Sequence, residues 1–293
     1  MSESNRPAWL DDKDSEEMKK SASQAEYIVS RLPEFGSLMS GNFSTRDAAK
    51  LLAEAVAQGY LELTVTLLDR GADVNSVQRF HVPALLRVQE QVKEHREEDD
   101  SWVVKEKPHK VKIVDLLLKH GADIHAHRSR GYTALHDAVA AGDIETMKLL
   151  IANGADVNGR EVRNDGGSKQ YTPVFHKCAN LDEGVDASVV PEMIKILVDA
   201  GADINRQDND QKTTALHETV FKGKCEIAKA LIAAGISPEI RDERSLTALE
   251  LAKKVNNPND IVQCLKDCGA RDYVEEEKIA AQSAQVKACC TIV

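Results

Sequence analysis

The chain has 293 residues, and 38 Lys and Arg stand against 48 Asp and Glu, which gives a formal net charge of −10. This acidic balance argues against nucleic acid as a partner, because a nucleic-acid-binding surface needs basic residues to neutralise phosphates. Hydrophobic residues make up 42% of the chain and aromatic residues only 4%. These values are typical of a globular protein whose core is built from aliphatic side chains.

The N-terminal segment, residues 1–44, is polar and contains neither an apolar run nor a secretory signal. Residues 15–32 are predicted to form one capping helix that ends before Pro33. No stretch of the whole chain approaches the roughly 20 apolar residues that cross a bilayer. Together with 6 Cys, the missing signal predicts free thiols and a cytoplasmic location.

Two short strings recur in the segment 45–272 and define its period. The string Gly-Ala-Asp-Val/Ile begins at Gly71, Gly121, Gly154 and Gly201, with weaker forms at Gly235 and Gly269. The string Thr-Ala-Leu begins at Thr133, Thr214 and Thr247, and related residues stand at Pro83 and Thr172. The spacing corresponds to a period of about 33 residues that is interrupted by two insertions.

The unit from Gly131 to Asn158 shows what each repeated residue does. Thr133 has the position of a helix N-cap, and the apolar residues that follow it keep helical spacing. Gly142 ends this first helix where a left-handed residue is needed. A second apolar helix follows and ends at Gly154, after which Ala-Asp-Val-Asn begins a turn into the next unit.

These strings resemble the ankyrin repeat family, whose consensus contains T-P-L-H-x-A at the same period. The resemblance covers the array 45–272 and implies an all-α solenoid of about six helix–turn–helix repeats. Short β-hairpin turns would join the repeats, and N- and C-terminal helices would flank them. The C-terminal segment, residues 273–293, is predicted to form a helix and a tail.

The two insertions fall within residues 89–109 and within residues 160–171 and 181–190. In the first, the acidic section 94–100 is expected to be a solvated helix extension or a loop. The neighbouring apolar residues 102–104 pack against the helices of the array or contact a partner. In the second, residues 164–168 suggest a hairpin tip, because the Lys-Ser/Thr of a phosphate-binding loop does not follow them.

Several residues of types that could act in catalysis or bind a metal have structural interpretations. His136, His176 and His217 take the same slot of successive repeats, where each can form local hydrogen bonds. His125 and His127 lack acidic or Cys partners for a metal, and Cys264 and Cys268 lack the two further ligands of a zinc site. We therefore predict no catalytic residue, no metal and no cofactor, and classify the chain as a non-enzyme.

The C-terminal Cys-Cys-Thr-Ile-Val offers three interpretations. Cys290, fourth from the end of the sequence, resembles a C-a-a-X prenylation site, and palmitoylation of Cys289 would supply a second anchor. Thr291 and Val293 also match a ligand of a PDZ domain, which needs a free carboxylate. An inert tail is the third interpretation. Prenylation would attach the protein peripherally to a membrane.

The predicted function is that of a monomeric, non-enzymatic adaptor or scaffold that binds another protein on the concave face of the repeat array. The resemblance places binding residues on hairpin tips and on the exposed side of the first helices. They are His127, Arg128, Arg130, Tyr132, Asp137, Tyr171, Lys177, Lys212, Glu218, Phe221, Lys222, Arg241 and Arg244, with Ala140 as a further position on the first of these helices. Phe221 is the principal candidate, because it replaces the small Ala140 of an earlier repeat. Alternatives are a lipid-anchored scaffold and the regulatory partner of an enzyme.

Overall fold

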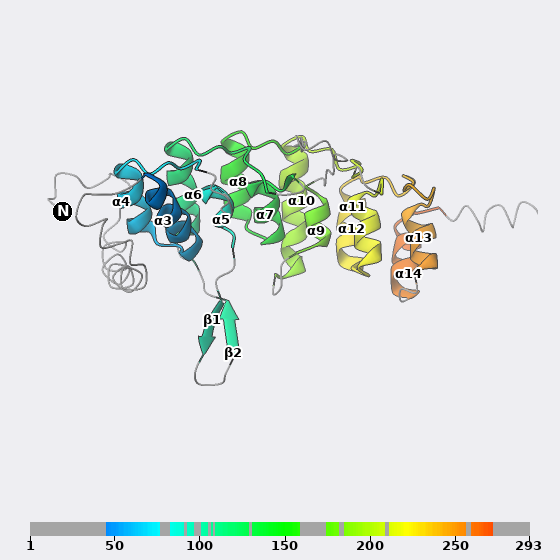
Figure 1. The fold of residues 1–293 in the computed structure, drawn as a ribbon. Helices are drawn as coiled ribbons and strands as arrows, with labels where there is room; N and C mark the ends of the chain where they lie inside the picture. Colours follow the sequence, from blue (N-terminus) through cyan, green and yellow to red (C-terminus); the bar gives the residue numbers. More distant parts are fainter. Residues whose placement is uncertain are drawn as a thin grey trace, which may run out of the picture. The chain divides into compact units, whose positions relative to one another are not determined.

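The computed structural model describes residues 45–76, 83–90, 93–96, 101–104, 107, 109–128, 131–158, 174–181, 185–208, 211–255 and 259–271. In this part of the chain the fold consists of short α-helices that are joined by turns, as the resemblance predicted (Figure 1). The helices expected at 15–32 and near the C-terminus lie outside the described residues. None of the described helices is both long and apolar enough to span a membrane.

The chain divides into two compact units. The first comprises residues 1–128 and 145–155, and the second comprises residues 129–144 and 156–293. Helices of the first unit are α3 (Thr45–Gln58), α4 (Leu61–Asp69), α5 (Ala84–Arg87), α6 (Lys110–Lys119) and α8 (Ile144–Ala152). Those of the second are α7 (Ala134–Ala140), α9 (His176–Ala179), α10 (Val190–Asp199), α11 (Ala215–Phe221), α12 (Cys225–Ala233), α13 (Ala248–Lys254) and α14 (Asn259–Asp267). A 3₁₀ turn over Ala187–Val189 precedes α10.

Each unit has an aliphatic core, as the low aromatic content predicted. In the second unit, Leu216 of α11, Leu231 of α12 and Leu265 of α14 are each 0% exposed. Helix α11 packs against α12 and also against α13, the first helix of the next repeat. Because every repeat covers the apolar face of its neighbour, its stability depends on the stack and not on the repeat alone.

Three of the first helices, α7, α11 and α13, begin after a capping threonine, and the residue three positions later completes the cap. The Thr214 backbone N–H donates to His217 Nδ1 at 3.3 Å, and the Thr214 hydroxyl lies 2.9 Å from the same nitrogen. His217 Nε2 lies 3.1 Å from the Leu246 carbonyl oxygen in the next hairpin. Thr247 and Glu250 form the equivalent cap in the last repeat. The structural interpretation of His217 is therefore confirmed.

Where the Gly-Ala-Asp-Val/Ile string ends in Asn75 or Asn158, that asparagine links its repeat to the next. Asn158 Nδ2 donates to the Gly201 carbonyl oxygen at 2.8 Å, and Asn158 Oδ1 accepts from the Asp203 N–H at 2.7 Å. In the first unit, Asn75 makes the same two bonds to Gly121 and Asp123. Both hydrogen bonds satisfy backbone groups of the following turn that the helices leave unpaired.

The first insertion contains a β-hairpin, so the expectation of a helix extension or loop for residues 94–100 was wrong for residues 94–96. Strand β1 (Lys93–Arg96) pairs antiparallel with β2 (Ser101–Val104), with Lys93 opposite Val104. The Trp-Val-Val of β2 favours an extended backbone. Lys107 closes the insertion, because its ammonium group donates to the carbonyl oxygens of Val88 and Glu90. Burial lowers the pKa of Lys107 to about 8.

Candidate protein-binding face

The second unit presents most of the candidate binding residues on its first helices and on the hairpins before them. Those described there are Tyr132, Asp137, Lys177, Lys212, Glu218, Phe221, Lys222, Arg241 and Arg244. His127 and Arg128 belong to the first unit. Arg130, Tyr171, Cys289 and Cys290 lie outside the described residues. Whether these residues bind a partner stays a prediction.

Phe221 is the most exposed large hydrophobic residue among those that the structure describes. Its exposed fraction is 59%, against 38% for both Val111 and Val198. It is the last residue of α11, whose apolar side, including Val220, is buried. The equivalent residue of α7, Ala140, is only 5% exposed, so Ala140 is a packing residue and not an available contact. A methyl group therefore fills this slot, and the phenyl ring of Phe221 extends beyond it into solvent.

Exposed basic side chains outnumber exposed acidic ones on the hairpins and first helices of the last two repeats. Within residues 211–222 and 241–255, the exposed basic residues are Lys212, Lys222, Arg241, Arg244, Lys253 and Lys254. The exposed acidic residue of these two segments is Glu243. Glu250, by contrast, is half-buried and accepts from Arg241 at 2.9 Å. The local charge is therefore opposite in sign to the net charge of the chain.

Two of these hairpins hold a side chain in a strained backbone position. Lys212 has φ 55° and Ser245 has φ 60°, and the equivalent residue of an earlier hairpin is Gly131 with φ 73°. A residue with a Cβ pays a steric penalty in this left-handed region. Sequence reasoning did not identify this strain, although both residues stand two positions before the capping threonine, as Gly131 does. Arg241 supports the second hairpin by donating to the Ser245 carbonyl oxygen at 2.6 Å.

Other candidates are held by internal contacts. Lys177 Nζ lies 3.9 Å from the centre of the Tyr132 ring, which is the geometry of a cation–π pair. Glu218 accepts a hydrogen bond from Asn180 Nδ2 at 3.1 Å. In the first unit, Arg128 donates to the Leu86 carbonyl oxygen and lies 3.5 Å from Glu90. These contacts hold the side chains in place within their own units.

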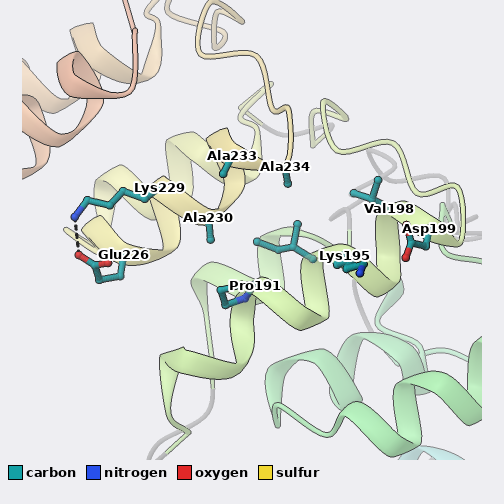
Figure 2. A pocket seen from close by; sticks show the side chains of 10 residues that line it. Pro191, Lys195, Val198, Asp199, Glu226, Lys229, Ala230, Ala233 and Ala234 are labelled. Atoms are coloured by element: carbon teal, nitrogen blue, oxygen red, sulfur yellow. Dashed lines mark hydrogen bonds and ion pairs between the residues drawn. The ribbon is translucent and has the colours of Figure 1, made fainter.

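A shallow groove that the sequence did not indicate runs between α10 and α12, the second helices of adjacent repeats (Figure 2). Its volume is about 550 Å³, and its floor includes Pro191, Ile194 and Ala230. Lys229 at its edge pairs with Glu226 at 2.8 Å. Charges of both signs thus border this groove, in contrast to the basic surroundings of Phe221.

The described residues contain no cluster of His, Cys, Asp or Glu that would hold a metal ion. Cys264 lies near the N-terminal end of α12, where its thiol donates to the Cys225 carbonyl oxygen at 3.6 Å. Burial raises the pKa of Cys264 to about 11, so this thiol stays protonated at neutral pH and is a poor nucleophile.

Comparison with known proteins supports the repeat architecture. The family model described as ankyrin repeats (3 copies) matches residues 102–161 and 186–276. The chain is 30% identical over 199 residues to the nuclear factor NF-kappa-B p105 subunit of Gallus gallus, covering 67% of this chain and 17% of that protein. It is 29% identical over 143 residues to Rabankyrin-5 of Mus musculus, covering 48% and 12% of the two chains. The match therefore spans less than a quarter of the length of either relative.

A solved structure shares the fold at low sequence identity. It is a chain of the complex between the Bd0816 predatory endopeptidase of Bdellovibrio bacteriovorus and the immunity protein Bd3460. The TM-score is 0.52 at 20% identity, and the alignment covers 74% of this chain and 97% of that chain. With the capped helix pairs, the repeated asparagine links and the family match over half its length, this chain belongs to the ankyrin repeat family.

Proposed function

We propose that the protein is a non-enzymatic adaptor that binds another protein through the first helices and hairpins of its second unit. The single observation that carries this proposal is the 59% exposure of Phe221 in a slot where α7 has a buried alanine. Covering a large exposed apolar side chain with another surface removes it from water and lowers the free energy. Aromatic anchors of this kind commonly dominate the energy of protein interfaces.

Membership of the ankyrin repeat family supports the proposal at a coarser level, since ankyrin repeats generally mediate protein–protein binding. Because a fold alone does not determine a partner, the partners of the relatives are not transferred to this chain. The exposed residues of its own hairpins and first helices supply the specificity.

Replacing Phe221 with alanine tests the proposal. The full-length protein and the Phe221→Ala variant are used to capture partners from a lysate of the native host, and quantitative mass spectrometry compares the captured proteins. Loss of an anchor worth about 1–3 kcal/mol reduces capture by about five- to 150-fold. Urea unfolding of the same variant is expected to remain near that of the parent protein, because the ring is not part of the core.

Val198→Ala is the matched control. Val198 is also an exposed apolar residue, 38% accessible, but it belongs to α10, a second helix, and borders the outer groove. It should leave capture unchanged. The proposal fails if both variants retain the same set of captured proteins as the parent, or if Phe221→Ala loses them only because it unfolds.

A further inference from the structure

The basic strip around Phe221 consists of Lys212 and Lys222 from the repeat of α11, and Arg244 and Lys254 from the repeat of α13. We propose that this strip binds an acidic segment of the partner that carries one apolar residue for Phe221. This inference rests on the proposed function and adds the chemical class of the bound segment.

The packing of the last two repeats brings the strip together. Helices α11 and α13 pack side by side, and each begins at an equivalent capping threonine. Lys254 therefore takes, one repeat later, the slot that Phe221 takes in α11. Lys222 directly follows Phe221 in the chain, and all three side chains are exposed. An apolar ring is thus bordered by two ammonium groups at the ends of adjacent helices.

The hairpins add positive charge beyond the other ends of the same helices. Lys212 and Arg244 are exposed on successive hairpins, and Gln207 joins the two by donating to the carbonyl oxygens of Lys212 and Arg241. A helix of seven residues such as α11 is about 10 Å long. The strip is therefore about 10 Å long in the direction of the helix axes, which is the length of a short extended peptide.

The basic side chains of the strip are exposed, including that of Arg244, which forms an ion pair. Arg244 reaches the Asp242 carboxylate at 3.5 Å, yet the Arg244 side chain is 66% exposed. Lys212 occupies a left-handed position that glycine would occupy at lower cost. Strain that persists at an exposed position is characteristic of functional sites. A basic site on a chain of net charge −10 favours a short acidic segment, because a long polyanion would also meet the acidic remainder.

A synthetic probe tests the charge of the partner without requiring its identity. The probe is a short fluorescein-labelled peptide that alternates Glu and Ser around one central Leu. Two matched peptides replace every Glu with Gln or with Lys. Fluorescence anisotropy of the full chain should show binding of the Glu peptide that weakens as salt is added, because salt screens exposed charges. The Gln and Lys peptides should bind at least about tenfold more weakly.

Variants locate the binding to the strip. The double variant Lys212→Glu/Lys222→Glu should weaken binding of the Glu peptide by about tenfold or more at low salt. Lys195→Glu is the control, because it reverses an exposed charge on α10, in the same unit but on a second helix. It should change the affinity by less than about twofold. Phe221→Ala should weaken binding of the Glu peptide. It should not weaken binding of an otherwise identical peptide that has Ser in place of Leu.

Several results would overturn the inference. The partner is not acidic if the Gln or Lys peptide binds as tightly as the Glu peptide, or if the Glu peptide does not bind. The strip is not the site if Lys195→Glu has the same effect as the double variant. Binding of phosphatidylserine vesicles or a single-stranded oligonucleotide, without binding of the Glu peptide, would assign the strip to another class of ligand. None of these results decides the capture experiment with Phe221→Ala, which tests the proposed function. The two proposals can therefore fail independently of each other.

Discussion

Val185 lies directly against Gly142, at the turn where α7 ends. A β-carbon added to Gly142 would stand 2.7 Å from Val185 Cγ1 and 3.3 Å from Val189 Cγ2. Gly142 also has φ +65°, which a residue with a side chain adopts at a cost of about 1–2 kcal/mol. We therefore expect Gly142→Ala to lower the free energy of unfolding by about 2 kcal/mol or more, measured by urea unfolding with circular dichroism.

The control for this prediction is Gly201→Ala. Gly201 has φ +82°, but no heavy atom lies within 4 Å of the position that its β-carbon would take. This variant should therefore pay the backbone cost alone. Equal losses for the two variants would show that the contact with Val185 contributes nothing.

The asparagine links between repeats predict a second effect on stability. Asn158→Ala removes two hydrogen bonds, to Gly201 and to Asp203, whose distances are 2.8 and 2.7 Å. Each is expected to contribute about 0.5–1.5 kcal/mol, so the variant should lose about 1–3 kcal/mol of stability. Asn153→Ala is a matched control, because the Asn153 amide bonds only to the Leu149 carbonyl oxygen of its own helix. A loss no larger than that of Asn153→Ala would contradict the linking role.

We expect the left-handed backbone at Lys212 to lower the stability of the fold, while the charge of Lys212 strengthens binding of an acidic segment. Lys212→Gly relieves the left-handed strain at φ 55°, and we expect it to raise the midpoint of thermal unfolding by a few degrees, equivalent to about 0.5–1 kcal/mol. The same variant should bind the acidic probe more weakly because it loses a charge. Ser245→Gly has the same φ argument without a change of charge. Ser245→Gly should therefore stabilise the protein and leave probe binding unchanged. If either substitution destabilises the protein, the left-handed backbone at that position does not cost stability.

The sequence predicted the repeat architecture because its capping residues have local causes. The sequence predicts a helix N-cap at Thr133 and a helix end at Gly142 in a left-handed conformation; the structure confirms both. The exposure of Phe221 agrees with the reasoning that compared it with Ala140 in equivalent slots. These successes share one basis: a residue's role follows from its position in a repeat.

Features that depend on atoms far apart in the chain were not predicted. The bonds from Asn158 to Gly201 join positions 43 residues apart, although the recurrence of Asn after Gly-Ala-Asp-Val/Ile could have suggested them. The pairing of β1 with β2 was missed because the acidic composition of residues 94–100 favoured a solvated helix extension or loop. The charge of the strip also went unnoticed, since the overall composition is acidic and the basic residues come from two repeats.

Burial of His176 predicts a loss of stability in mild acid. Its side chain is buried, and burial lowers the pKa of His176 to about 4 from an ordinary value of 6.5. Below pH 6.5 the unfolded chain therefore binds a proton that the folded chain does not bind until about pH 4. The unfolded state is favoured as a result, and the free energy of unfolding should fall by about 1 kcal/mol between neutral pH and pH 5.5. Burial lowers the pKa of His217 as well, which adds to the same trend.

Urea unfolding of the parent protein and His176→Gln, at a series of pH values between 7.5 and 5, measures this contribution. The variant should start with lower stability at neutral pH, but its stability should change less with pH because it lacks one of the two histidines whose pKa burial lowers. His125→Gln, which removes an exposed histidine, should retain the full pH dependence of the parent. A His176→Gln variant whose stability falls as steeply with pH as that of the parent would show that His176 takes up its proton equally in both states.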